Sequence, residues 1–426
     1  MVHLVVTGAL LLSLGASLRL LRPLHPVQLW LAAWSVSLSL YSLRLIPYRP
    51  MGFLTGALIL GATAGFALGV IGVERALSRR ARARLRPLSI AEDAPAVKIG
   101  AAIALTGTAA LLALFLAQAV RGYGVHDTLV SSASVRRAVE NGDFAITVKY
   151  AYFALTAVPL SVLAALLSEG RERRGWALAA AAAIGAIYFT TARSAIWLAA
   201  GSAVFVWALV AQSRLGLRQL AYAGGGLVAL GAVILVGGGS LIGKTFHRTD
   251  LSMIRTSFSD HSYLEPVAIP YEYASNPIAA LDLQVKAEPT WGHARGCATL
   301  APACRVLRTL GLPTRPEPSL RAFTAAPVRW NTYTALDRPI VDGGPALVVP
   351  IILLLGAAVG VAWVVVSARS AGGIFAYALV GPAVLFTPAA NFAATEHFLG
   401  PLVIGGGLLW TGRQLARRRV REPSLV

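Results

Sequence analysis

Apolar runs of about twenty residues recur along almost the whole of this 426-residue chain. A helix needs ~20 apolar residues to cross the ~30 Å hydrocarbon core of a bilayer. Hydrophobic residues make up 56% of the chain and charged residues 13%, so the charges are too few to cover this much apolar surface in water. The sequence therefore predicts an all-α polytopic membrane protein, with lipid as the solvent for much of the chain.

About eleven segments are long and apolar enough to span a bilayer. The first begins at Val2 with no basic region before it and no small-residue cleavage site after it, so we expect a retained helix rather than a cleaved signal peptide. No internal repeat divides the chain, which predicts a single transmembrane domain, 1–426. The predicted spans are 2–21, 27–46, 53–73, 99–120, 148–168, 174–191, 194–212, 219–242, 343–366, 370–387 and 397–413.

Arginine clusters beside the ends of these runs predict the orientation, because cytoplasmic connections carry an excess of Lys and Arg. If every span is real, all the Arg-rich connections and the Arg-rich tail fall on one side. The N-terminus is then outside and the C-terminus inside, and a large, partly helical loop, 244–340, is extracytoplasmic between spans 8 and 9. The arginines that define the inner side include Arg19, Arg22, Arg75, Arg79, Arg80, Arg171, Arg173, Arg214, Arg218, Arg369, Arg417 and Arg418.

The net charge of +19 is carried largely by these clusters. A nucleic-acid-binding protein usually carries its basic patch on a polar domain, so we expect no nucleic-acid partner. Two cysteines, Cys297 and Cys304, lie in the large loop. They form a disulfide if that loop is extracytoplasmic, or they remain two thiols; neither their spacing nor their neighbours indicate a metal site.

Cationic side chains on the predicted outer side form a first group of candidate site residues. Arg193 lies between two apolar runs with almost no loop, and Arg136 and Arg137 precede the span that begins near Lys149. Snorkelling to the interface and a basic interfacial helix are the plain interpretations. The alternative is a set of diphosphate contacts, because the planar guanidinium suits bidentate phosphate binding.

The large loop forms a second group, since a loop of this length is uncommon unless it is functional. Asp260, His261 and Ser262 lie close together at its start, but spacing alone does not supply the positioned base and oxyanion site of a hydrolase. His247, His261 and His293 do not follow a helix-face metal pattern, so we expect no metal and no cofactor.

The exit from the loop is its most specific part. Asn331, Tyr333 and Thr334 form an Asn-x-Tyr-Thr element, and Asp342 and Gly344 form an Asp-x-Gly element directly before a span. An N-capped helix start would account for Asp342 and the glycines after it. It does not account for the preceding Asn-x-Tyr-Thr.

The order of these motifs resembles the bacterial oligosaccharide repeat-unit polymerases, the O-antigen polymerase group. That family carries an Asn-x-Tyr-Thr element and then an Asp-x-Gly at the start of the next helix. The segment 271–282, which includes Tyr273, and the segment 291–311 also resemble family segments. Leu300 and Gly343 depart from the family pattern, which often has an aromatic residue at each position.

The resemblance implies a metal-independent glycosyltransferase without a cofactor in the bacterial cytoplasmic membrane, with its active site facing outside. It would move a glycan from a polyprenyl diphosphate carrier onto a new lipid-linked oligosaccharide repeat unit. Membrane lipid, a flippase and a chain-length regulator are the further expected partners. The expected catalytic residues are Arg193, Asp342 and His261, with the general base left open among Asp342, His261 and none. The expected substrate contacts are Arg136, Arg137, Lys149, Asn331, Tyr333, Thr334 and Tyr273.

Other functional classes make different demands on the sequence. An O-antigen ligase-like enzyme uses the same donor but usually has His at the loop exit, where this chain has Asn331. A lipid-linked glycan flippase or other transporter would bury charged residues in mid-span, and the predicted spans hold almost none. A transferase that uses polyprenyl-phosphate sugars would show an acidic pair in the first outer loop, where residues 45–52 contain no carboxylate.

Overall fold

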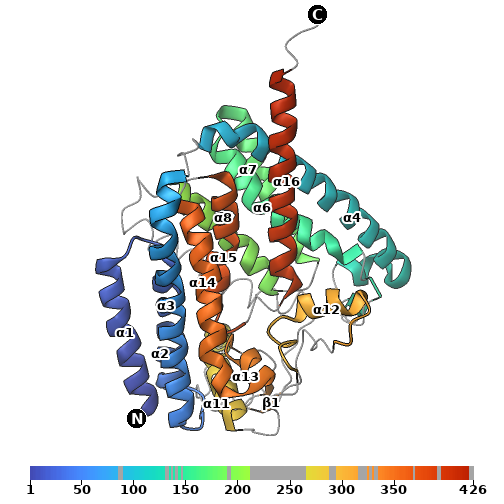
Figure 1. Cartoon of the computed structure of the whole chain (residues 1–426). Helices are drawn as coiled ribbons and strands as arrows, with labels where there is room; N and C mark the ends of the chain where they lie inside the picture. The colour runs from blue at the N-terminus through green and yellow to red at the C-terminus, as the bar shows by residue number, and fades with distance from the viewer. Residues whose placement is uncertain are drawn as a thin grey trace, which may run out of the picture. The chain divides into compact units, whose positions relative to one another are not determined.

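In the computed structural model, the residues that the structure describes are almost all helical or in short connections between helices (Figure 1). The chain divides into two compact units: residues 1–81, 246–364 and 383–396 form unit 1, and residues 82–245, 365–382 and 397–426 form unit 2. The single membrane domain expected from the sequence stays a prediction. The structure describes residues 1–84, 90–129, 134–135, 138–139, 143–144, 147–189, 193–211, 265–286, 294–314, 324–325, 329–330, 334–367, 370–390 and 395–421.

Unit 1 combines long apolar helices with shorter elements of the large loop. Its apolar helices are α1 (Val2–Leu20), α2 (Pro26–Leu43), most of α3 (Phe53–Arg84) and most of α14 (Val348–Ser367), which follows the 3-10 turn η5 (Pro345–Leu347). Its loop elements are α11 (Glu265–Lys286), α12 (Ala301–Thr309), the antiparallel strand pair β1 (Thr324–Ala325) and β2 (Arg329–Trp330), and α13 (Asp337–Gly343).

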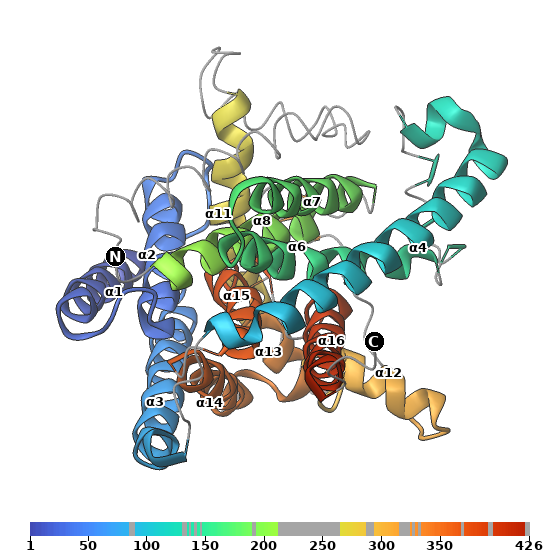
Figure 2. The same ribbon diagram turned by 90° about the horizontal axis from the view of Figure 1, so that it is seen from above.

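Unit 2 is built around α6, which packs against α4, α7 and α8. The helix α4 changes direction near its end (Figure 2), because Gly124 has the non-helical angles φ 81° and ψ 166°. The elements of unit 2 are η1 (Ile90–Asp93), α4 (Ala94–Leu129), η2 (Thr147–Lys149), α6 (Tyr150–Leu166), α7 (Gly170–Tyr188), α8 (Arg193–Ala211), most of α15 (Ala371–Leu385) and most of α16 (Glu396–Arg421).

Several of these helices have the length and composition of membrane spans. Among the described residues, four segments are long and apolar enough to cross a bilayer: Val2–Leu20, Phe53–Leu77, Ile90–Thr128 and Pro345–Ser367. They expose large apolar side chains, such as Leu12 at 79% and Leu68 at 66%, that would be costly to leave in water. These observations agree with the predicted all-α membrane protein.

Each predicted span within the described residues coincides with a helix, and the eighth, 219–242, lies outside them. Several helix ends differ from the predicted bounds. The helix α3 continues past residue 73 to Arg84, because Ala, Leu and Arg are good helix formers even where the chain becomes polar. The helix α4 continues past residue 120 to Leu129, and α14 begins at Val348 rather than at 343.

Glycines bring α3 and α14 close together, as the two neighbouring helices in Figure 2 show. A methyl group at Gly69 would lie 2.2 Å from the Leu353 carbonyl oxygen, and one at Gly356 would lie 2.4 Å from the Phe66 carbonyl oxygen. Small residues at such positions let membrane helices gain backbone-to-backbone packing, which replaces the hydrophobic effect as the force between helices in lipid.

A charged contact ties η1 to the last two helices of unit 2. The buried carboxylate of Asp93 accepts hydrogen bonds from Arg413 Nε at 2.9 Å and Nη2 at 2.8 Å, and from the Ala371 backbone N–H at 3.2 Å. The bidentate geometry and the third donor compensate the carboxylate for its lost hydration.

Candidate functional site

The helix α11 of the large loop is docked onto the short connection between α2 and α3. The Leu45 N–H donates to the Tyr271 hydroxyl at 3.1 Å, and the Tyr48 hydroxyl and Ser275 Oγ are hydrogen-bonded at 2.8 Å. Burial raises the pKa of both phenols above the usual value, so they remain protonated. Because Tyr271 and Ser275 are one helical turn apart, they lie on one face of α11.

A third residue of the same face, Asp282, completes this docking. Its buried carboxylate accepts from the Gly52 N–H at 2.8 Å and from Thr55 Oγ1 at 2.7 Å, and it pairs with Lys286. Gly52 directly precedes α3, so Asp282 satisfies a donor at the N-terminus of a helix more than two hundred residues away. We call Tyr48, Tyr271, Ser275 and Asp282 the α11 cluster.

Asp342 holds a turn of the large loop by three backbone hydrogen bonds. Its Oδ1 accepts from Gly296 at 2.8 Å and Ala298 at 2.9 Å, and its Oδ2 accepts from Thr299 at 2.8 Å. The alternative interpretation of Asp342 as the N-cap of the following span is therefore wrong: Asp342 lies within α13 and fixes residues 296–299.

The same turn contains a disulfide, which was one of the two possibilities that the sequence allowed. Cys297 and Cys304 are bonded to each other, and this bond joins the turn to α12. Gly344 follows α13 with φ 80°, a backbone conformation that glycine adopts without steric cost. Gly343 lies close to the next turn of the chain, because a methyl group there would lie 2.2 Å from Leu347 Cδ1.

The predicted sugar contacts of unit 1 fall on elements that pack together. Tyr273 is half-buried on α11, and Thr334 is buried just before α13, where its Oγ1 accepts the Leu336 N–H at 3.2 Å. The helices α11 and α13 are in contact. Tyr273, Thr334 and Asp342 all lie in unit 1, and their roles toward a substrate stay predictions.

The predicted diphosphate contacts belong to unit 2. Lys149 is exposed at the end of η2, with Nζ 3.1 Å from the Tyr152 hydroxyl and 4.9 Å from the centre of the Tyr152 ring. The backbone of Arg193 begins α8. The following predicted residues lie outside the described part of the chain: Arg136, Arg137, His261, Asn331, Tyr333 and the side chain of Arg193.

Two buried polar residues of α11, Glu272 and Asn276, were not predicted from the sequence. They are buried to 1% and 0% exposure, about 100° around the helix from the α11 cluster. The signal that marks them is the i, i+4 spacing of a carboxylate and a carboxamide within an otherwise apolar stretch. Leaving a buried amide without hydrogen bonds costs about 1–3 kcal/mol.

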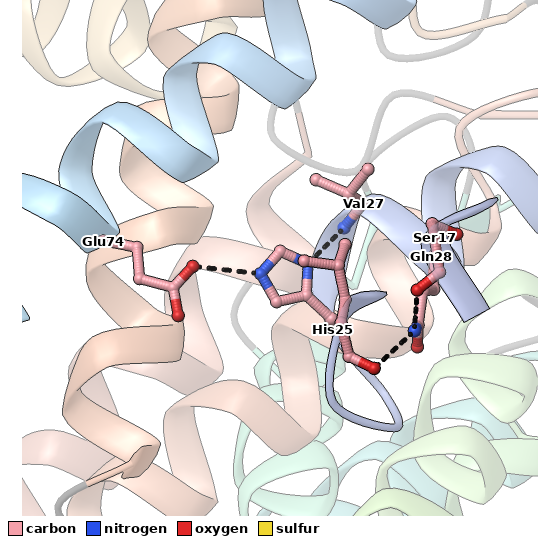
Figure 3. A network of polar contacts seen from close by, with 6 residues as sticks. Ser17, His25, Val27, Gln28 and Glu74 are labelled. Carbon is pink, nitrogen blue, oxygen red and sulfur yellow. Dashed lines mark hydrogen bonds and ion pairs between the residues drawn. The ribbon is translucent and has the colours of Figure 1, made fainter. Parts of the chain in front are cut away.

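A separate polar cluster surrounds His25, at the turn between α1 and α2 (Figure 3). The Val27 N–H donates to Nδ1 at 3.3 Å, and Nε2 lies 3.2 Å from Glu74 Oε2. This pattern is that of a neutral imidazole with its proton on Nε2. Burial lowers the pKa of His25, although the hydrogen bond to Glu74 acts in the opposite direction.

The neighbouring Gln28 extends this cluster, since its Nε2 donates to the carbonyl oxygens of Ser17 at 3.0 Å and Leu21 at 3.2 Å. These carbonyls belong to the C-terminal end of α1, where backbone acceptors lack partners within the helix. We call Ser17, His25, Gln28 and Glu74 the His25 cluster. Its contacts fix the turn between the first two helices and contain no arrangement of nucleophile and base.

Within the described ranges, no three His, Cys, Asp or Glu side chains come together as a metal site. The expectation of a metal-free, cofactor-free site therefore stays a prediction. Comparison of the chain with family models, curated proteins and solved structures gives no match.

Proposed function

We propose that this protein is a membrane glycosyltransferase that polymerises polyprenyl-diphosphate-linked oligosaccharide repeat units on the outer face of the bacterial cytoplasmic membrane. The observation that carries the proposal is the neighbourhood of α11 and the loop exit. In the chain, the Asn-x-Tyr-Thr element precedes α13 and the Asp-x-Gly element forms its end, and α13 and β2 both contact α11. The packing of these elements on α11 suits a site that must orient a sugar acceptor.

The polar contacts support the proposed span arrangement, with the N-terminus outside. The contacts of α11 join the loop to residues 45–55, and both segments are predicted outside. His25 contacts Glu74, and Asp93 contacts Ala371 and Arg413, all near predicted inner ends. Among the described residues, no hydrogen bond of these clusters joins a predicted outer connection to a predicted inner one. A disulfide between Cys297 and Cys304 also suits an oxidising compartment outside the cytoplasm.

The proposed chemistry needs stabilisation of a diphosphate leaving group. We assign this to Arg193, with Arg136, Arg137 and Lys149 as further cations, because fixed positive charges stabilise the charge that develops as the glycosidic bond forms. Asn331, Tyr333, Thr334 and Tyr273 would line the sugar site. We assign Asp342 a positioning role rather than that of general base, because its carboxylate already accepts three backbone hydrogen bonds.

Specific residues disfavour two alternative functions. A ligase-like transferase is disfavoured by Asn331 at the loop exit, where such enzymes usually have His. A flippase or transporter is disfavoured by the position of the buried carboxylates. Among the described residues, the buried acidic side chains lie in the connection before α4 or in the large loop, not within predicted spans: Asp93, Glu272, Asp282, Asp337 and Asp342.

The decisive experiment is deletion of the gene in its host, followed by analysis of the surface polysaccharide. Loss of long chains, with single repeat units still attached to the acceptor lipid, supports a polymerase. Long chains that accumulate unattached indicate a ligase instead. An unchanged polysaccharide rejects both transferase readings.

The role of Arg193 is tested in the complemented strain. We expect Arg193→Ala to abolish chain extension at normal expression, and Arg193→Lys to retain part of it, because lysine keeps the charge and loses the bidentate fork. Full extension by Arg193→Ala would reject the diphosphate contact.

Orientation is tested by labelling intact cells with a membrane-impermeant thiol reagent. The native cysteines are bonded to each other, so they do not compete for the label. A cysteine introduced at Arg82 should remain unlabelled, and one introduced at Arg49 should react. Labelling of the first from outside would overturn the arrangement.

A further inference from the structure

The short helix α12 exposes its apolar face instead of burying it. Four apolar residues in and directly after α12 follow the i, i+3, i+4, i+7 spacing that puts side chains on one helix face: Ala303, Val306, Leu307 and Leu310. All four are exposed, Leu310 to 73% and Val306 to 59%. The buried residues of α12, Ala301 and Cys304, lie on the other side. A helix on the surface of a globular protein normally buries its apolar face, so the exposure of this face indicates an interaction partner.

The C-terminal end of α12 extends this face in a fixed geometry. The Leu312 N–H donates to the Leu307 carbonyl at 3.0 Å, and the Gly311 N–H donates to the Arg308 carbonyl at 3.0 Å. Together with φ 84° at Gly311, these bonds form a Schellman motif, which returns the chain to the last turn of the helix. Leu312 is exposed there, as is Leu300 at the other end of α12. We call the exposed leucines and valine of this element the α12 apolar surface: Leu300, Val306, Leu307, Leu310 and Leu312.

Contacts with α13 place the α12 apolar surface beside the start of a candidate membrane span. Asp342 holds residues 296–299 by its three backbone hydrogen bonds, and Ala294 and Ala298 pack with Val341. The apolar segment Pro345–Ser367 begins directly after α13, and the three residues from 342 to 345 extend about 11 Å at most. Figures 1 and 2 show α12 running across the direction of α14. In a bilayer that α14 crosses, α12 therefore lies close to the surface and along it.

The charges around α12 suit anionic lipid headgroups. From residue 294 to residue 314 the chain has three arginines and no acidic residue. Arg295 and Arg308 are exposed. Arg308 lies on the opposite side of α12 from the α12 apolar surface, as in helices that lie in a membrane interface. In such helices the apolar face enters the boundary of the acyl chains, and long cationic side chains reach the headgroups.

We propose that α12 is an interfacial anchor, with the α12 apolar surface in the outer leaflet of the bilayer and Arg295 and Arg308 in contact with lipid phosphates. The proposal depends on the chain crossing a membrane and not on glycosyl transfer, so it is tested independently of the polymerase function. Asp342 and the Cys297–Cys304 disulfide connect this anchor to α13. The large loop is then attached to the bilayer at two points, through α12 and through the start of α14.

The test measures the depth of single spin labels on the full-length chain in lipid vesicles. The native cysteines are bonded to each other, so the label reacts with an introduced thiol. Leu310→Cys replaces a largely exposed side chain and leaves the core intact. We expect its label to show a several-fold higher ratio of collisions with dissolved oxygen to collisions with a water-soluble nickel chelate than a label at Thr309→Cys. Thr309 is the matched control, because it is exposed on α12 but outside the α12 apolar surface.

The composition of the vesicles tests the arginines. The label at Leu310→Cys should lie deeper in vesicles of phosphatidylcholine and phosphatidylglycerol than in vesicles of phosphatidylcholine alone, because the first carry negative headgroups. Replacing both Arg295 and Arg308 by Gln should remove this difference. The same depth in both kinds of vesicle would reject the contact with lipid phosphates.

Other results overturn the anchor itself. Equal and frequent collisions of both labels with the nickel chelate would show that the α12 apolar surface faces water. A label at Leu310→Cys that is shielded from oxygen and chelate alike would show that protein covers this surface, and dipolar broadening between labels would then identify a second copy of the chain. Should a thiol at position 310 exchange with the native disulfide, Leu312→Cys provides the same measurement with the same expected result.

Discussion

Two regions of unit 1 bury polar groups, and they do so over different distances along the chain. The large loop joins α11 to residues 45–55 across more than two hundred residues, and Asp342 to the turn at 296–299 across more than forty. The His25 cluster joins neighbours within α1 and α2, with Glu74 as its distant member. The first region depends on charged acceptors, whereas the second depends on a neutral imidazole. The difference teaches that hydrogen bonds to distant segments help to hold the loop in place, whereas those of the His25 cluster mainly fix a local turn.

Removing Asp342 should damage the loop most. We expect Asp342→Ala to lower the free energy of unfolding by about 4 kcal/mol, because three backbone N–H groups lose a charged acceptor. Thermal unfolding in detergent measures the loss. Asp342→Asn keeps one acceptor oxygen and should cost less. If Asp342→Ala instead abolishes chain extension with unchanged stability, Asp342 takes part in the chemistry and the positioning role is wrong.

Removing Asp282 should detach α11 from the start of α3. The expected loss is about 3 kcal/mol for Asp282→Ala, because Gly52 N–H and the Thr55 hydroxyl both lose their acceptor. Lys286→Met is the matched control. The Lys286 side chain is 53% exposed, so this substitution should cost less than about 1 kcal/mol. Equal losses for the two variants would mean that the ion pair, and not the capping of α3, holds α11.

Opening the disulfide should loosen the turn without releasing α11. The bridge spans a sequence separation of 7, and the loop-entropy relation gives about 2 kcal/mol for so short a loop. Replacing both Cys297 and Cys304 by Ser, or adding a reductant, should increase amide hydrogen exchange in residues 294–314. Exchange in α11 should stay unchanged. Faster exchange throughout α11 would show that the two parts of the loop unfold together.

The smallest effect should come from protonation of His25. Its pKa is lowered in the folded protein, mainly by burial, so near and below pH 6.5 the unfolded chain binds more protons than the folded one. This residue therefore contributes stability that is present above pH 6.5 and is lost as the pH falls from there toward the lower, folded pKa. Unfolding followed between pH 8 and 5.5 should show this slope, and His25→Gln should reduce it. An unchanged slope in the variant would assign the effect to another group.

The all-α membrane class and the positions of most described helices followed from local sequence, because a run of about twenty apolar residues has few alternatives to a helix in lipid. The helix ends were less predictable. At Arg84, helix propensity carried α3 beyond its apolar run, and at Gly343 and Gly344 a short helix, a glycine and a 3-10 turn intervened before α14. A count of apolar residues does not detect these helix ends and turns, since each of these residues is compatible with several backbone conformations.

The candidate site was accessible to sequence reasoning in part. Tyr273, Thr334 and Asp342 were selected by motif; all three lie in unit 1, and their roles at a site stay predictions. Their partners were not selected, because nothing in the chain marks Asp282 as the acceptor for Gly52 or Ser275 as the partner of Tyr48. Contacts between segments this far apart depend on how the helices pack. The spacing of residues within one helix does not predict that packing.

The sequence by itself determined that this chain is helical, that it belongs in a membrane and that its polar chemistry gathers in one large loop. It also determined the motif order at 331–344, since that order is a property of the linear chain. Tertiary structure alone decided that Asp342 holds a turn and that α11 rests on residues 45–55. It also decided that, among the described residues, Asn276 is buried without a hydrogen bond from its side chain, while Ser275 beside it makes two. The physical reason is that a hydrogen bond gains its value from the burial and geometry of both partners, and these exist only once distant segments have packed together.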